Sequence, residues 1–80
     1  MTKEELQAII CAGLECSYLE VKGDDGRHFQ ATVVSPVFEG LMKVKQHQMV
    51  YATLGNRMQT DEVHALELKT FAPSKWAEQI

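Results

Sequence analysis

The spacing of apolar residues switches along the chain between the period of a helix and the period of a strand. Thr2 and Glu5 have the spacing of a capping box, and the apolar residues after them recur at intervals of three and four. They predict a first helix from about Lys3 to Leu14. Over residues 18–33 apolar positions instead alternate with polar ones on both sides of a turn rich in glycine and aspartate, which predicts a β-hairpin.

The second half of the chain shows the same two periods in the same order. Intervals of three and four predict a second long helix, roughly Met42 to Met58, and period two returns from Val63 to Thr70 as a third strand. Pro73 then opens a last helical turn through Trp76. This order has too few crossovers for a doubly wound parallel sheet. The predicted fold class is α+β, with a three-stranded sheet, helices packed on one face and the order α-β-β-α-β-α.

The length allows one small domain over residues 1–80. A chain this short buries only about 60% of the surface that its unfolded form exposes, so its 45% hydrophobic content is needed for folding. No apolar stretch approaches the roughly 20 residues that span a bilayer, and the polar, acidic N-terminus differs from a secretory signal. We therefore expect a cytoplasmic protein that does not enter the membrane.

The two cysteines agree with that compartment, because secreted domains of this size usually carry several disulfides. Cys11 is interpreted as a small buried hydrophobe and Cys16 as structurally neutral. Their spacing, without further cysteines or a histidine pair, is not that of a zinc site.

The charge is unevenly distributed along the chain. The total is −3, but residues 27–60 carry four basic side chains against Glu39 alone. Nucleic-acid affinity depends mainly on neutralised phosphates, so an acidic chain is a poor general binder, although one basic face could still serve. The candidates are Lys43, Lys45 and Arg57. A solvated helix face is the simpler interpretation.

Three histidines are the candidates for chemistry near neutral pH, and each has a structural alternative. His28 lies where the hairpin turn enters its second strand, and the alternative is an exposed turn residue. His47 lies in the apolar stripe of the second helix, where a partly buried structural histidine is expected. His64 starts the third strand on its core-facing side, as either a satisfied core histidine or a ligand. No nucleophile, phosphate-loop or zinc-protease motif occurs, and we predict no enzymatic activity.

Several short motifs together resemble the BolA-like family. They are Phe38-x-Gly40, Val44-x-x-His47-x-x-Val50-Tyr51-x-x-Leu54, His64-Ala65-Leu66 and Pro73-x-x-Trp76. The hairpin over residues 23–30 most resembles the branch of acid-stress proteins. The resemblance spans essentially the whole chain and implies a fold similar to a class II KH domain.

The resemblance also implies a function without catalysis. Members of the family pair with monothiol glutaredoxins and share a bridging 2Fe-2S cluster, with glutathione, for iron–sulfur trafficking or for sensing iron or stress. Carried over to this sequence, the ligands are His64 of the H-A-L motif and His28 of the hairpin. Imidazole ligation in place of thiolate raises a cluster's potential and makes binding sensitive to pH. Alone, the chain is expected to hold no cofactor and to be a monomer or weak homodimer.

Two departures from the family pattern bear on a DNA-binding alternative. Some members are described as DNA-binding transcription regulators, a role that would here use Lys43, Lys45 and Arg57. However, Gln46 stands where members often have a basic residue, and the G-x-x-G loop of nucleic-acid-binding KH domains is missing. A scaffold that binds a protein partner without metal is a third hypothesis.

Overall fold

The computed structural model describes residues 1–23, 28–58 and 65–79, and they form an α+β domain. The elements in chain order are α1 (Lys3–Gly13), β1 (Tyr18–Lys22), β2 (His28–Val34), the 3-10 helix η1 (Pro36–Phe38), α2 (Lys43–Thr53), β3 (Ala65–Phe71), α3 (Pro73–Trp76) and a 3-10 turn η2 (Ala77–Gln79). The predicted fold class and element order are confirmed, but the prediction that the helices pack on one face holds for α1 and α2 alone, because α3 packs on the other face.

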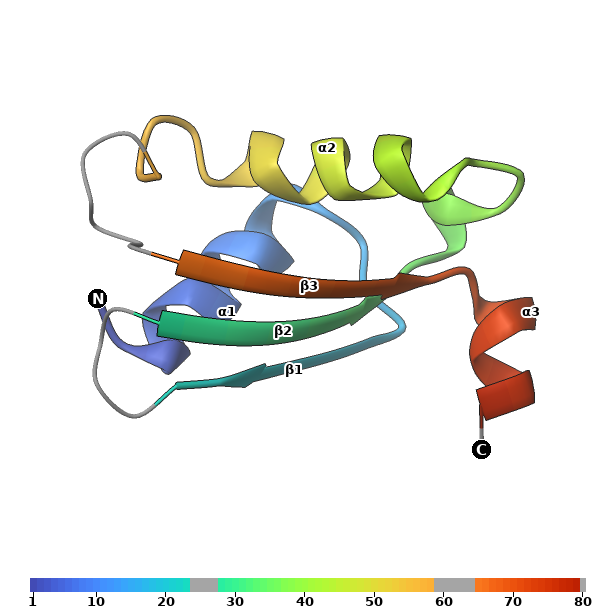
Figure 1. The fold of residues 1–80 in the computed structure, drawn as a ribbon, viewed down its shortest axis with the longest axis horizontal. Helices are drawn as coiled ribbons and strands as arrows, with labels where there is room; N and C mark the ends of the chain where they lie inside the picture. Colours follow the sequence, from blue (N-terminus) through green and yellow to red (C-terminus); the bar gives the residue numbers. More distant parts are fainter. Residues whose placement is uncertain (24–27, 59–64, 80) are drawn as a thin grey trace.

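The sheet has the strand order β1-β2-β3 (Figure 1). β1 and β2 form the predicted antiparallel hairpin. β3 instead pairs in parallel with β2, from His28 opposite Ala65 to Val34 opposite Phe71. A parallel pair needs a crossover between its strands, and α2 supplies it. Consequently β2 and β3 start at the same end of the sheet.

Helices α1 and α2 cover one face of the sheet, and the main core lies between the two layers. The capping box of α1 is present, because the Thr2 hydroxyl accepts from the Glu5 N–H at 3.1 Å and the Glu5 carboxylate accepts from the Thr2 N–H at 3.2 Å. Both helices, the first two strands and the connecting segments supply its buried residues, and partly buried Leu66 and Leu68 of β3 pack against them. The buried residues are Leu6, Ile10, Leu14, Val21, Phe29, Ala31, Val33, Phe38, Val50, Leu54 and Ala72.

Cys11 is exposed, so its interpretation as a buried hydrophobe was wrong. The helix buries Leu6 and Ile10 four positions apart, and the next residue lies about 100° further around the helix axis. Cys11 therefore faces solvent.

Helix α2 differs from its prediction in both length and rotation. It ends at Thr53 rather than Met58, and residues 54–58 form turns in which Gly55 has a φ of 61°. The residues that it turns inward are Gln46 and Val50, followed by Leu54, so Val44, predicted in the apolar stripe, is 56% exposed. Gln46 is buried because its amide holds the connector before the helix, donating to Leu41 O at 2.9 Å and Phe38 O at 3.4 Å.

The short helix α3 packs at one end of the opposite sheet face. Tyr18, Val34 and Phe71 are register partners on that face, and the Trp76 ring stacks on Tyr18 at 5.1 Å between centroids and contacts Phe71 at 5.3 Å. Val34 is fully buried there without belonging to the main core. Trp76, the one tryptophan of the chain, therefore reports on the attachment of α3.

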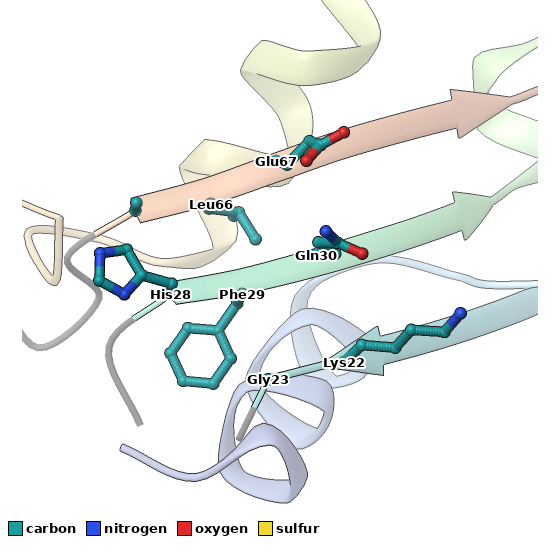
Figure 2. Close-up of a pocket in the computed structure, with 8 residues that line it drawn as sticks. Lys22, Gly23, His28, Phe29, Gln30, Leu66 and Glu67 are labelled. Atoms are coloured by element: carbon teal, nitrogen blue, oxygen red, sulfur yellow. The ribbon is translucent and has the colours of Figure 1, made fainter. Parts of the chain in front are cut away.

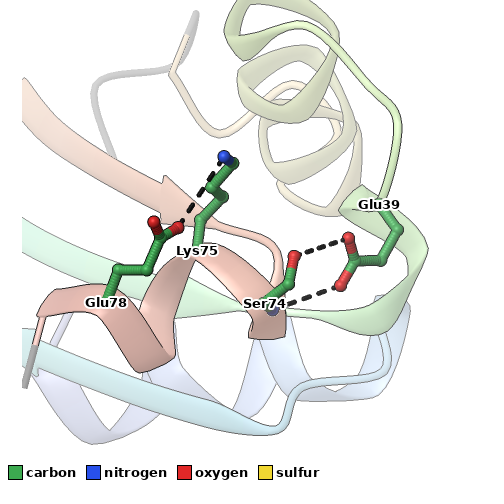
Figure 3. A network of polar contacts seen from close by, with 4 residues as sticks. All are labelled: Glu39, Ser74, Lys75 and Glu78. Atoms are coloured by element: carbon green, nitrogen blue, oxygen red, sulfur yellow. Dashed lines mark hydrogen bonds and ion pairs between the residues drawn. The ribbon is translucent and has the colours of Figure 1, made fainter.

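Replacing Glu39 with alanine should loosen α3. The residue before α3 is Ala72, which has no side chain to cap it, and the Glu39 carboxylate accepts instead from the Ser74 N–H at 3.2 Å and hydroxyl at 2.9 Å (Figure 3). Losing a cap costs about 1 kcal/mol. We expect a red shift of Trp76 fluorescence. Glu78→Ala is the control, because that carboxylate only forms an exposed ion pair with Lys75 at 3.7 Å; equal shifts in the two variants would contradict a capping role.

Candidate functional site

An open hollow of about 500 Å³ lies at the end of the sheet where β2 and β3 begin (Figure 2). Its lining includes basic, acidic, polar and apolar side chains and a glycine. The residues are Lys22, Gly23, His28, Phe29, Gln30, Ala65, Leu66 and Glu67. All three strands contribute to it, so the hollow exists only because β3 returns beside β2.

His28 is exposed at the first position of β2, beside this hollow. The next residue, Phe29, is 2% exposed in the core, so the strand is anchored directly after the histidine. The period of two then directs the side chains of His28 and Phe29 to opposite faces. The exposure of His28 at the entry to the strand agrees with both of its sequence interpretations, a ligand and an exposed structural residue.

His64 lies outside the described residues. The residue that follows it in the chain, Ala65, is the first of β3, the register partner of His28 and part of the hollow's lining. Residues 63–64 of the predicted third strand also lie outside the described part, and the strand itself runs to Phe71, one residue beyond its predicted end.

His47 is half-buried on α2, as predicted for a structural histidine, and does not line the hollow. Over residues 1–23, 28–58 and 65–79, no three side chains of histidine, cysteine, aspartate or glutamate are grouped to hold a metal ion. Any metal centre at the hollow would therefore need ligands beyond these residues.

The three basic candidates for nucleic-acid contact do not gather on one helix face. The Lys43 ammonium donates to Thr70 O and lies 4.3 Å from the centroid of the Phe71 ring. Lys45, two positions on, is exposed and points elsewhere, because residues two apart on a helix do not share a face. Arg57 follows the end of α2 and donates from Nη1 to Leu54 O at 3.0 Å.

The two cysteines should differ in reactivity. Cys16 is half-buried and its thiol donates to Leu14 O at 3.4 Å. Burial, and then the negative charge of the nearby Cys11 thiolate, raise the pKa of the Cys16 thiol. Because the thiolate is the nucleophile, iodoacetamide near pH 8 should modify exposed Cys11 first, and the Cys16 rate should keep rising at higher pH. Peptide mass spectrometry measures both rates, and the difference should vanish in denaturant; faster modification of folded Cys16 would refute the argument.

Comparison with known proteins identifies the family. Residues 6–75 match the family model described as BolA-like protein. The chain belongs to the BolA-like family. Acid stress protein IbaG of Escherichia coli K12 is 34% identical over 77 residues, which cover 96% of this chain and 90% of the relative. A solved BolA homologue from Coxiella burnetii has 40% identity and a TM-score of 0.83, covering 96% of this chain and 97% of the homologue.

A further relative bears on the DNA-binding alternative. The protein named DNA-binding transcriptional regulator BolA of Haemophilus influenzae is 36% identical over 52 residues, which cover 65% of this chain and 50% of the relative. The named relatives are thus stress and regulatory proteins rather than enzymes. Within the described residues, no helix is long and apolar enough to cross a membrane.

Proposed function

We propose that this BolA-like protein partners a monothiol glutaredoxin and shares with it a bridging 2Fe-2S cluster for iron–sulfur trafficking or for sensing iron or stress. His64 is the principal ligand and His28 the second. The partner and glutathione would supply the remaining ligands. The protein itself carries out no catalysis and acts in the cytoplasm.

The observation that supports this proposal is the pairing of His28 with Ala65 beside an open hollow. Parallel strands begin at the same end of a sheet, and the H-A-L histidine directly precedes Ala65 in the chain. His28 and Ala65 are 37 positions apart in sequence (65 − 28), yet they are register partners at one end of the sheet.

Among the described residues, His28 is the one proposed ligand of such a cluster. Imidazole nitrogens ligate iron in Rieske-type clusters, and His28 lies exposed on the surface that a second protein would approach. When bound, the cluster would supply a redox centre that can be handed on. The chain's own part is to hold the entry of β2 rigidly, through buried Phe29, and to leave the hollow open for a partner.

Cluster assembly tests the proposal directly. The protein is mixed anaerobically with a monothiol glutaredoxin, glutathione, iron and sulfide, and visible absorption and circular dichroism are recorded. We expect a spectrum that differs from that of glutaredoxin alone. His64→Ala should abolish the difference and His28→Ala should alter it, because each removes a ligand.

His47→Ala is the matched control, since this third histidine is half-buried on α2 and does not line the hollow. It should leave the spectrum unchanged. A spectrum that stays that of glutaredoxin alone with the wild-type protein, or one that survives His64→Ala, would rule out the proposed cluster.

A DNA-binding regulator is the second candidate, favoured by the name of the Haemophilus relative. Lys43 and Lys45 of α2 are both exposed, but the Lys43 ammonium already donates to Thr70 O, so Lys45 is the first candidate, with Lys43 and Arg57 as further ones. Binding would fall steeply with salt, and Lys45→Gln should weaken it about equally on all sequences. Binding measured across a salt series checks this; affinity that is independent of salt would exclude phosphate contacts.

A further inference from the structure

The sheet face opposite α1 and α2 carries an ordered pattern of charges. Register partners form cross-strand rows on this face. One row is Lys22, Gln30 and Glu67, and the next is Glu20, Thr32 and Lys69. Apart from half-buried Thr32, these side chains are exposed. Each outer strand therefore carries one lysine and one glutamate, in opposite order.

This pattern is complementary to itself. Consider a second copy that faces the first and is related to it by a two-fold axis that lies parallel to the sheet face and perpendicular to the strands. The strands of the second copy then run in reverse, β1 lies over β1, and each charged row lies over the other charged row of the second copy. Lys22 then meets Glu20 of the second copy, and Glu67 meets its Lys69. Gln30 meets Thr32 between them, and both side chains donate and accept hydrogen bonds. Every charge in the two rows faces the opposite charge, as a two-fold interface requires.

The same rotation brings the two different ends of the face together. At one end lies the hollow beside His28, and at the other end α3 stands on the face through Trp76. Reversed strands bring α3 of each copy to the hollow of the other. The alternative axis, parallel to the strands, also pairs opposite charges but places α3 against α3, which would hold the sheets apart.

We propose that a second copy of this chain docks on the open sheet face, with strands reversed and the C-terminal helix of each copy over the His28 hollow of the other. From the His28–Ala65 pair to the Tyr18, Val34 and Phe71 partners, the face spans about 10 by 20 Å, given strand spacings of about 4.8 Å and a rise of about 3.3 Å per residue. Stable interfaces bury about 800 Å² per partner, so this association is weak. This dimer would cover the candidate cluster site at His28 until a partner protein displaces the second copy. That role of the dimer rests on the proposed function.

Sedimentation velocity of the purified full chain, without iron or glutaredoxin, tests the proposal. The weight-average mass of the wild type should rise toward two chains between about 10 μM and about 1 mM, where weak complexes form. Lys22→Glu should remain a monomer, because it places two glutamates against each other. Adding Glu20→Lys to Lys22→Glu exchanges the pair and should restore association.

The double variant Lys22→Glu/Glu67→Lys is the matched control. It has the same net charge as the restored variant, but with reversed strands it leaves like charges facing each other and should remain a monomer. Three outcomes overturn the proposal: a wild type that is monomeric at about 1 mM, a dimer that survives Lys22→Glu, or restoration by Glu67→Lys instead of Glu20→Lys. None of them affects the cluster proposal, which is tested separately by His64→Ala spectra.

Discussion

Phe38→Ala is expected to destabilise the domain by about 3–5 kcal/mol, the usual cost of truncating a buried aromatic side chain. Phe38 is fully buried in the main core although it lies in the short connector η1 rather than in a long helix or a strand. Folded domains are typically stable by only about 5–15 kcal/mol, and one of 80 residues lies near the lower end. The variant should therefore be partly unfolded at room temperature.

Urea denaturation followed by far-ultraviolet circular dichroism measures this loss. Val37→Ala is the control, because Val37 is the preceding residue in the same connector and is 41% exposed. Surface substitutions of this kind usually change the free energy of unfolding by less than about 0.5 kcal/mol. If the two variants were equally stable, Phe38 would not be a core residue.

The elements that local patterns specify were predictable from the sequence. The capping box fixed the start of α1, since all its contacts lie within three residues of each other. The turn residues and alternating strands predicted the hairpin for the same reason. In both cases neighbours in the chain determine the structure.

Helix α2 shows where local patterns fail. Its apolar residues recur at intervals of three and four on more than one side, and only packing against α1 and the sheet decides which side faces inward. Burial of Gln46 accompanies a hydrogen bond that the sequence does not show, the one that its amide donates to the carbonyl group of Leu41. A buried polar group with such a role cannot be distinguished by spacing from one on a solvated face.

The sequence predicted which residues belong to the candidate site better than it predicted how they are arranged in space. The exposure of His28 follows from its place at the first residue of β2. The pairing of His28 with Ala65 depends on β3 lying parallel to β2. These residues are far apart in sequence, so local patterns do not predict their contact. The charged rows of the open face likewise depend on the register of three strands, and appear only in the folded sheet.

Gly23→Ala is expected to cost about 1–3 kcal/mol, as overpacking usually does, and to displace the entry of β2 that carries His28. A Cβ atom at this position would lie 2.6 Å from Phe29 Cδ1 and 2.8 Å from the carbonyl oxygen of His28. The Phe29 ring is buried in the core and the carbonyl belongs to the backbone, so neither can yield without moving the strand. Urea denaturation gives the cost, and the backbone amide shifts of His28 and Phe29 in NMR spectra give the displacement.

Gly13→Ala adds the same methyl group and serves as the comparison. Its Cβ would lie 2.9 Å from Thr53 Cγ2, a side-chain methyl that can move, and alanine is favoured over glycine in a helix by up to about 1 kcal/mol. The close contact with Thr53 destabilises the variant and the higher helix propensity of alanine stabilises it, so the free energy of unfolding should be close to that of the wild type. Equal stability of the Gly23→Ala and Gly13→Ala variants would show that β2 can shift freely. In that case Phe29 would not hold His28 in a fixed position, and the rigid entry on which the cluster proposal relies would be lost.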